Sequence, residues 1–159
     1  MLKEAIRDYA TEAFRFWAFV GGVEAYKARL LADIQQPEIV GGSGGPTTPT
    51  ESAAIRAEER LESAAAAIAD LEAVERTMDG LEAMQDGELV RAAVEEIYMA
   101  AAHRKPERGE IQARVTRFGG KRNVSERNVY RCLRKARILF AVERGLRYTD
   151  YAKVGSSGF

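Results

Sequence analysis

Eight basic or polar residues lie close together between positions 121 and 135, and their side chains suit the binding of nucleic acid. Arginine can donate two hydrogen bonds to O6 and N7 of guanine, and asparagine can pair in the same way with N6 and N7 of adenine. We predict that Arg127, Asn128 and Arg131 contact base edges. The other members of the set, which suit phosphate contacts or helix capping, are Lys121, Arg122, Ser125, Arg134 and Lys135.

The spacing of these residues predicts a helix that begins at Ser125, whose hydroxyl would cap it, and stops at Gly145. At 100° per residue, Arg127, Arg131 and Arg134 fall within roughly 60° of one another. An apolar stripe lies on nearly the opposite side of the same helix. We expect this stripe to pack on Ile111, Val115 and Tyr98, and its members are Val129, Leu133, Ala136 and Phe140.

A shorter helix over Glu110 to Phe118, ended by Gly119-Gly120, precedes the basic one. A short helix, a turn and a capped basic helix together are typical of a helix-turn-helix, whose second helix enters the major groove of duplex DNA. We therefore predict a DNA-binding domain over 83–148. In this prediction the residues from Gly119 to Asn123 lengthen the turn.

Charge is unevenly distributed along a chain whose net charge is zero. Residues 100–159 hold 15 Lys and Arg against 5 Asp and Glu, whereas residues 51–99 hold 4 against 13. A basic segment of this kind indicates nucleic-acid binding. The alternative is that the basic helix docks on the acidic segment of its own chain. Tyr130 is the only aromatic residue near the basic face, which favours duplex DNA over stacked single-stranded RNA.

Helical periodicity without strand-like alternation predicts an all-α fold. An N-terminal helical segment over 1–36, bent or divided at Gly21-Gly22, leads into a Gly- and Pro-rich flexible linker over 37–49. Thr50 begins a long acidic helix over 50–82, and Asp86 caps a further helix that Pro106 ends. Residues 149–159 form a flexible tail.

The acidic helix has two interpretations. Its apolar positions either face the core of a helical bundle or form a subunit interface, in which the small residues Ala64 to Ala67 allow two backbones to approach closely. The second interpretation makes the protein a homodimer.

Composition argues against an enzyme, a metal site or a cofactor. The chain has one histidine, His103, and one cysteine, Cys132, so it lacks the residues for a two-histidine or thiolate metal cluster. It also has no phosphate-binding loop followed by lysine and no nucleophile elbow. Its longest apolar stretch, Phe14 to Val23, is shorter than the roughly 20 residues that span a bilayer. We expect no catalytic residues, no membrane association and a reducing, cytoplasmic location.

In three features the chain resembles the RinA/ArpU-type regulators of bacteriophage late genes, whose C-terminal part is similar to region 4 of sigma factors. Glu24-Ala25-Tyr26-Lys27 precedes a Gly-rich segment, Pro49-Thr50-Glu51 begins the next helix, and Ser125 to Arg131 is similar to the Ser-x-Arg-x-Val-Tyr-Arg recognition helix. The resemblance implies a DNA-binding regulator that activates phage packaging, morphogenesis or lysis genes in a bacterial host. It also implies DNA contacts by Arg127, Asn128 and Arg131.

Two further hypotheses remain. A small terminase subunit would combine a DNA-recognition helix-turn-helix with an oligomerising helical region. A protein-interaction module would use the basic helix to bind an acidic partner. Under the regulator hypothesis, the acidic middle segment is a candidate contact for host RNA polymerase.

Overall fold

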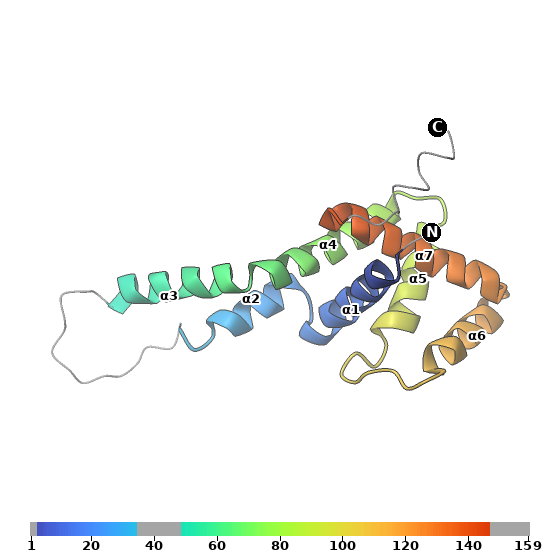
Figure 1. The fold of residues 1–159 in the computed structure, drawn as a ribbon, viewed down its shortest axis with the longest axis horizontal. Coiled ribbons are helices and arrows are strands. Elements are labelled where there is room, and N and C mark those ends of the chain that lie inside the picture. The colour runs from blue at the N-terminus through green and yellow to red at the C-terminus, as the bar shows by residue number, and fades with distance from the viewer. Residues whose placement is uncertain (1–2, 35–48, 147–159) are drawn as a thin grey trace.

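Every regular element in the part of the chain that the structure describes is a helix, as the sequence predicted. The computed structural model describes residues 3–34 and 49–146, and Figure 1 shows their arrangement. The predicted tail, and the predicted linker apart from Pro49, lie outside these residues. The elements are α1 (Glu4–Val20), α2 (Val23–Leu31), α3 (Pro49–Ser63), α4 (Ala65–Glu82), α5 (Gly87–Ala93), η1 (Val94–Met99), α6 (Glu110–Arg122) and α7 (Glu126–Arg144).

The N-terminal segment is two helices in series, one of the two arrangements that its sequence allowed. Gly21 and Gly22 separate them with φ angles of 82° and 100°, which L-residues with side chains rarely adopt. Glu75 of α4 fixes the corner, because its Oε1 accepts hydrogen bonds from Trp17 Nε1 (3.2 Å) and from the amide of Val23 (3.1 Å). A carboxylate at the first amide of α2 also favours that helix through its dipole.

The predicted acidic helix over 50–82 is present, but it begins at Pro49 and is interrupted at Ala64. Its first half, α3, packs beside α2, where Arg60 donates to the carbonyl of Leu30 (2.9 Å) and pairs with Asp33. Figure 1 shows α2 and α3 projecting together from the rest of the helices. Its second half, α4, belongs to the core.

The core lies where α1, α4 and α7 meet the α5–η1 segment and α6. Phe14 of α1 is fully buried and its ring lies 5.7 Å from that of Phe140 and 6.1 Å from that of Tyr98. The predicted apolar stripe of α7 is confirmed: Val129, Leu133, Ala136 and Phe140 are all buried.

The helix predicted from Asp86 to Pro106 differs from the structure at both ends. Asp86 precedes α5 but makes no side-chain capping hydrogen bond. The helix widens into the π-helix η1 and ends at Met99, because Ala100 is extended and Ala101 has a positive φ of 51°. Pro106 instead lies in the connection to α6.

Candidate nucleic-acid interface

Helices α6 and α7, which the sequence predicted as a helix-turn-helix, are joined by a shorter turn than the sequence indicated. Helix α6 continues through Gly119 and Gly120 to Arg122, so the prediction that these glycines end it and lengthen the turn is wrong. The turn consists of Asn123, Val124 and Ser125. Figure 1 shows α6 and α7 side by side at the end of the molecule opposite α3.

Two local features close this turn. Asn123 has a left-handed backbone (φ 53°), which asparagine tolerates better than most residues, and the amide of Val124 donates to the carbonyl of Gly119 at 2.9 Å. Ser125 then caps α7 as predicted, its Oγ accepting from the amide of Asn128 at 3.3 Å. The Gly119 carbonyl near the end of α6 and the Asn128 amide at the start of α7 therefore both have hydrogen-bond partners within the turn.

The two adjacent glycines have different roles, which yields a matched prediction. A Cβ on Gly119 would lie 2.5 Å from the carbonyl oxygen of Val124, whereas a Cβ on Gly120 would meet nothing within 4 Å. Gly119→Ala should lower the free energy of unfolding by about 1–3 kcal/mol, and Gly120→Ala should raise it by about 0.5–1 kcal/mol because alanine favours the helix. Urea denaturation measures both. Equal effects would contradict this description of the turn.

The outward face of α7 carries the three arginines that the sequence grouped together. Arg127, Arg131 and Arg134 are exposed, and within 3–34 and 49–146 none of them makes an ion pair or a side-chain hydrogen bond. Asn128 and Lys121 are also exposed. These side chains are therefore available for a ligand along the first three turns of α7 and the end of α6.

Two of the predicted phosphate contacts have partners inside the molecule instead. Lys135 Nζ donates to both carboxylate oxygens of Asp86, at 2.8 and 2.9 Å. Arg122 pairs with Glu96 through two hydrogen bonds, one of them 3.1 Å long, and its guanidinium lies 4.0 Å from the ring centre of Phe118. Each acid lies more than 20 positions away from its partner, so local spacing could not identify either pair.

A hollow of about 410 Å³ lies beside the first turns of α7, where this helix meets the start of α5. It is lined by polar and apolar groups from both elements and from the turn. Its residues are Asp86, Leu89, Asn123, Val124, Ser125, Asn128, Arg131, Cys132 and Lys135. Burial raises the pKa of the Cys132 thiol, so this cysteine is poorly suited to act as a thiolate at neutral pH.

One further cation on α6 was missing from the predicted set. Arg117 is exposed one turn before Lys121, and its side chain has no ion pair among the described residues. Residues four apart share a helix face, so Arg117 and Lys121 form a basic edge on α6. The spacing was visible in the sequence, but the predicted helix end at Gly119 obscured it.

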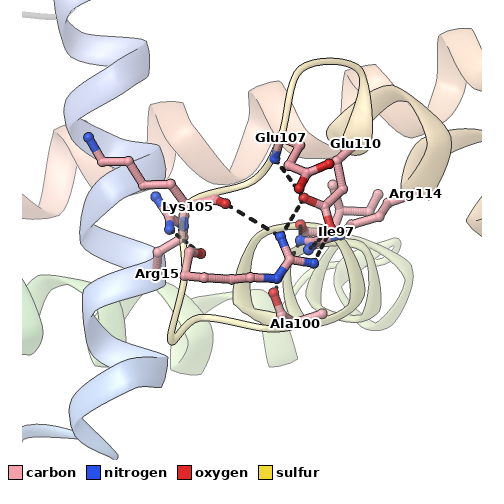
Figure 2. A network of polar contacts seen from close by, with 8 residues as sticks. Arg15, Ile97, Ala100, Lys105, Glu107, Glu110 and Arg114 are labelled. Atoms are coloured by element: carbon pink, nitrogen blue, oxygen red, sulfur yellow. Dashed lines mark hydrogen bonds and ion pairs between the residues drawn. The ribbon is translucent and has the colours of Figure 1, made fainter.

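A polar network holds the connection between η1 and α6 and thereby sets the start of α6 (Figure 2). Arg104 donates to both carboxylate oxygens of Glu110, at 2.6 and 2.9 Å, and the amide of Glu107 donates to the same carboxylate at 2.8 Å. Arg114 bonds the carbonyls of Ile97 (2.7 Å) and Ala100 (3.1 Å). These carbonyls at the end of η1 would otherwise lack helical partners.

Helix α1 is tied to the same connection. The side chain of Arg15 is largely buried, and it donates to the carbonyl of Arg104 at 2.7 Å and to Glu12 at the same distance. Figure 2 shows Arg15 reaching from α1 toward this loop. The placement of α6 therefore depends on contacts from both η1 and α1.

Glu110 is expected to make the stability of this region depend on acid pH. Hydrogen bonds from Arg104 and from the amide of Glu107 lower the pKa of Glu110 from 4.5 to about 2. A carboxyl whose pKa is lower in the folded state contributes stability above its unfolded pKa, and that contribution is lost as pH falls from about 4.5 toward 2. Glu110→Gln should therefore be less stable than wild type at pH 7, and the difference should shrink below pH 4.5.

Denaturant unfolding at pH 7, 5, 4 and 3 measures this difference. Glu107→Gln is the matched control, because this substitution removes the same charge from a neighbouring position. Glu107 contributes its backbone amide, and not its carboxylate, to the network. If the difference in the free energy of unfolding between Glu110→Gln and wild type stayed constant with pH, the lowered pKa assigned to Glu110 would be wrong.

Other kinds of site find little support in the described ranges. Across 3–34 and 49–146, no three His, Cys, Asp or Glu side chains converge in a way that could hold a metal ion. None of the helices described has the length and apolar character needed to cross a membrane. Comparisons of the chain with protein-family models, curated proteins and solved structures found no match.

Proposed function

We propose that the protein binds duplex DNA through α7 and acts as a sequence-specific transcriptional regulator. The observation that carries the proposal is the division of α7 into two faces. One face is buried in the core, and the other presents Arg127, Arg131 and Arg134 with no partner among the described residues. A helix held in this way can enter the major groove, because these three arginines are not engaged by the rest of the described fold.

The side chains divide into base-reading and phosphate-binding groups by their position on α7. Arg127, Asn128 and Arg131 lie in its first two turns, the part of a recognition helix that reaches base edges. Arg134 lies further along α7, and Arg117 and Lys121 lie on α6. Contacts of these three side chains with the phosphate backbone would fix the orientation of the protein on DNA. The amides at the start of α7 add donors for one phosphate.

The resemblance to late-gene regulators of phages supports a role in transcription rather than that of a small terminase subunit. It carries the proposal that the protein activates packaging, morphogenesis or lysis genes in the cytoplasm of a bacterial host. A contact between the acidic segment and host RNA polymerase is part of the same proposal.

We further propose that the α2–α3 pair assembles subunits. Between 51 and 63 no residue of α3 is buried, and Ile55 is 50% exposed. A helix that buries so little in one subunit gains most of its stability from packing against another. Light scattering separates the two candidate functions: a dimer fits a regulator, whereas a closed ring of about eight or more subunits would favour a small terminase subunit.

Selection of binding sites from random duplex DNA at near-physiological salt tests the proposed function. A regulator should enrich a defined motif, and a dimer should enrich two related half-sites. Binding without enrichment would favour the packaging role. Absence of binding would leave a protein-interaction module as the remaining candidate.

A further inference from the structure

Asp86 places a negative charge beside the face of α7 that the proposed function assigns to DNA. Both of its carboxylate oxygens accept hydrogen bonds from Lys135 Nζ, and the hydrogen bond from Lys135 is the main cause of its lowered pKa. Both side chains remain exposed to solvent, at 40% for Lys135 and 47% for Asp86. The pair therefore lies at the surface, where a ligand can compete for the lysine.

The position of the pair relates it to the proposed interface. Asp86, Asn128, Arg131 and Lys135 line the same hollow. On a helix, Lys135 is one turn from Arg131 and two turns from Asn128, so the three share one side of α7. Two oxygens on Lys135 Nζ are also what a phosphate group offers a lysine. The Asp86 carboxylate thus accepts the hydrogen bonds that Lys135 could otherwise donate to a phosphate.

Asp86 has no evident structural role that would explain its presence. Its side chain makes no capping hydrogen bond to α5, and an exposed ion pair contributes about 0–1 kcal/mol to stability. A change of Asp86 to asparagine should therefore leave the helices in place.

We infer that Asp86 limits the affinity of α7 for DNA by holding Lys135 away from the phosphate backbone. This inference rests on the proposed function. The restraint acts on a phosphate contact, so it sets how strongly the protein binds any duplex and does not alter which sequence it prefers.

The test measures binding of the full chain to a labelled random-sequence duplex over a range of salt concentrations. Four variants are compared with wild type: Asp86→Asn, Lys135→Gln, the double variant, and Asp79→Asn. Asp79 is exposed on α4 and has no partner in the described residues, so Asp79→Asn controls for the general effect of removing one negative charge. Circular dichroism establishes that each variant is folded.

If Asp86 restrains Lys135, Asp86→Asn should bind about three- to tenfold more tightly than wild type, and the slope of log K against log salt should steepen by about 0.9. The gain should vanish when Lys135→Gln is added. Asp79→Asn should change affinity by less than about twofold, because salt screens an isolated surface charge.

Three outcomes would overturn the inference. Asp86→Asn and Asp79→Asn with equal affinities would show that only net charge matters, and a gain that persisted in the double variant would show that Lys135 is not the group released. Both leave the proposed function standing. Wild-type protein that bound no DNA at low salt would overturn the proposed function and the inference together.

Discussion

Replacing Gly87 by alanine is expected to lower the free energy of unfolding by about 3 kcal/mol, the largest effect expected for a glycine-to-alanine change among the described residues. A Cβ at this position would lie 1.5 Å from the carbonyl oxygen of Leu81 and 2.6 Å from its carbonyl carbon. Both atoms belong to the backbone at the end of α4, so the clash can be relieved only by moving α4 relative to α5.

Gly80→Ala is the matched control. Gly80 lies inside α4, and a Cβ there would meet nothing within 4 Å, so alanine should stabilise the helix by about 0.5–1 kcal/mol. Urea denaturation of the two variants gives the comparison directly. A Gly87→Ala variant as stable as wild type would mean that α4 and α5 do not meet as closely as described.

The second large effect concerns DNA. Arg127→Ala combined with Arg131→Ala is expected to weaken binding to a selected site by about 2–6 kcal/mol, because a bidentate contact with a base contributes about 1–3 kcal/mol of discrimination. The same double variant should lose much less affinity for unrelated duplexes. The double variant should therefore lose sequence preference as well as affinity for the selected site.

A control variant removes two positive charges at the N-terminal end of α1, through Lys3→Ala and Arg7→Ala. Both residues are exposed, and neither belongs to α6, to α7 or to the α2–α3 pair that is proposed to assemble subunits. Competition titrations with selected and random duplexes should show nearly wild-type discrimination for this control. If Arg127 and Arg131 read no bases, the two double variants would weaken specific and random binding by the same factor.

Internal ion pairs account for part of the basic character of the C-terminal segment. Lys135, Arg122 and Arg144 pair with Asp86, Glu96 and Asp70 of the acidic segment, which is the alternative that the charge distribution left open. The arginines on the outer face of α7 do not take part in these pairs. The acidic segment therefore pairs with Arg122, Lys135 and Arg144 and leaves Arg127, Arg131 and Arg134 without a partner among the described residues.

Local signals in the sequence were sufficient to predict the start, the end and the buried face of α7. Ser125 caps it, Gly145 ends it with a φ of 74°, and the apolar stripe is buried as its spacing predicted. Each of these features depends on residues within one or two turns of the same helix. The all-α fold and the break at Gly21-Gly22 followed from the same kind of local information.

Features that depend on tertiary contacts were not predictable in the same way. A glycine pair ordinarily favours a helix end, yet α6 continues through Gly119. Glycine is required there for a tertiary reason, because a Cβ would lie 2.5 Å from the carbonyl oxygen of Val124. The end of η1 at Met99 depends on Arg114, which reaches back to two of its carbonyls. Pairs such as Asp86 with Lys135 join residues far apart in sequence, and a single sequence carries no signal for them.

The salt dependence of duplex DNA binding tests the central proposal most directly. Fluorescence anisotropy of a labelled duplex, titrated with protein at 50 to 200 mM salt, should show binding whose log K falls linearly with log salt. A slope of about −3 to −4 is expected, because Arg117, Lys121, Arg134 and the amides at the start of α7 would contact three to four phosphates and release their counterions. Absence of binding at 50 mM salt, or binding that did not change with salt, would contradict the assignment of α7 to DNA.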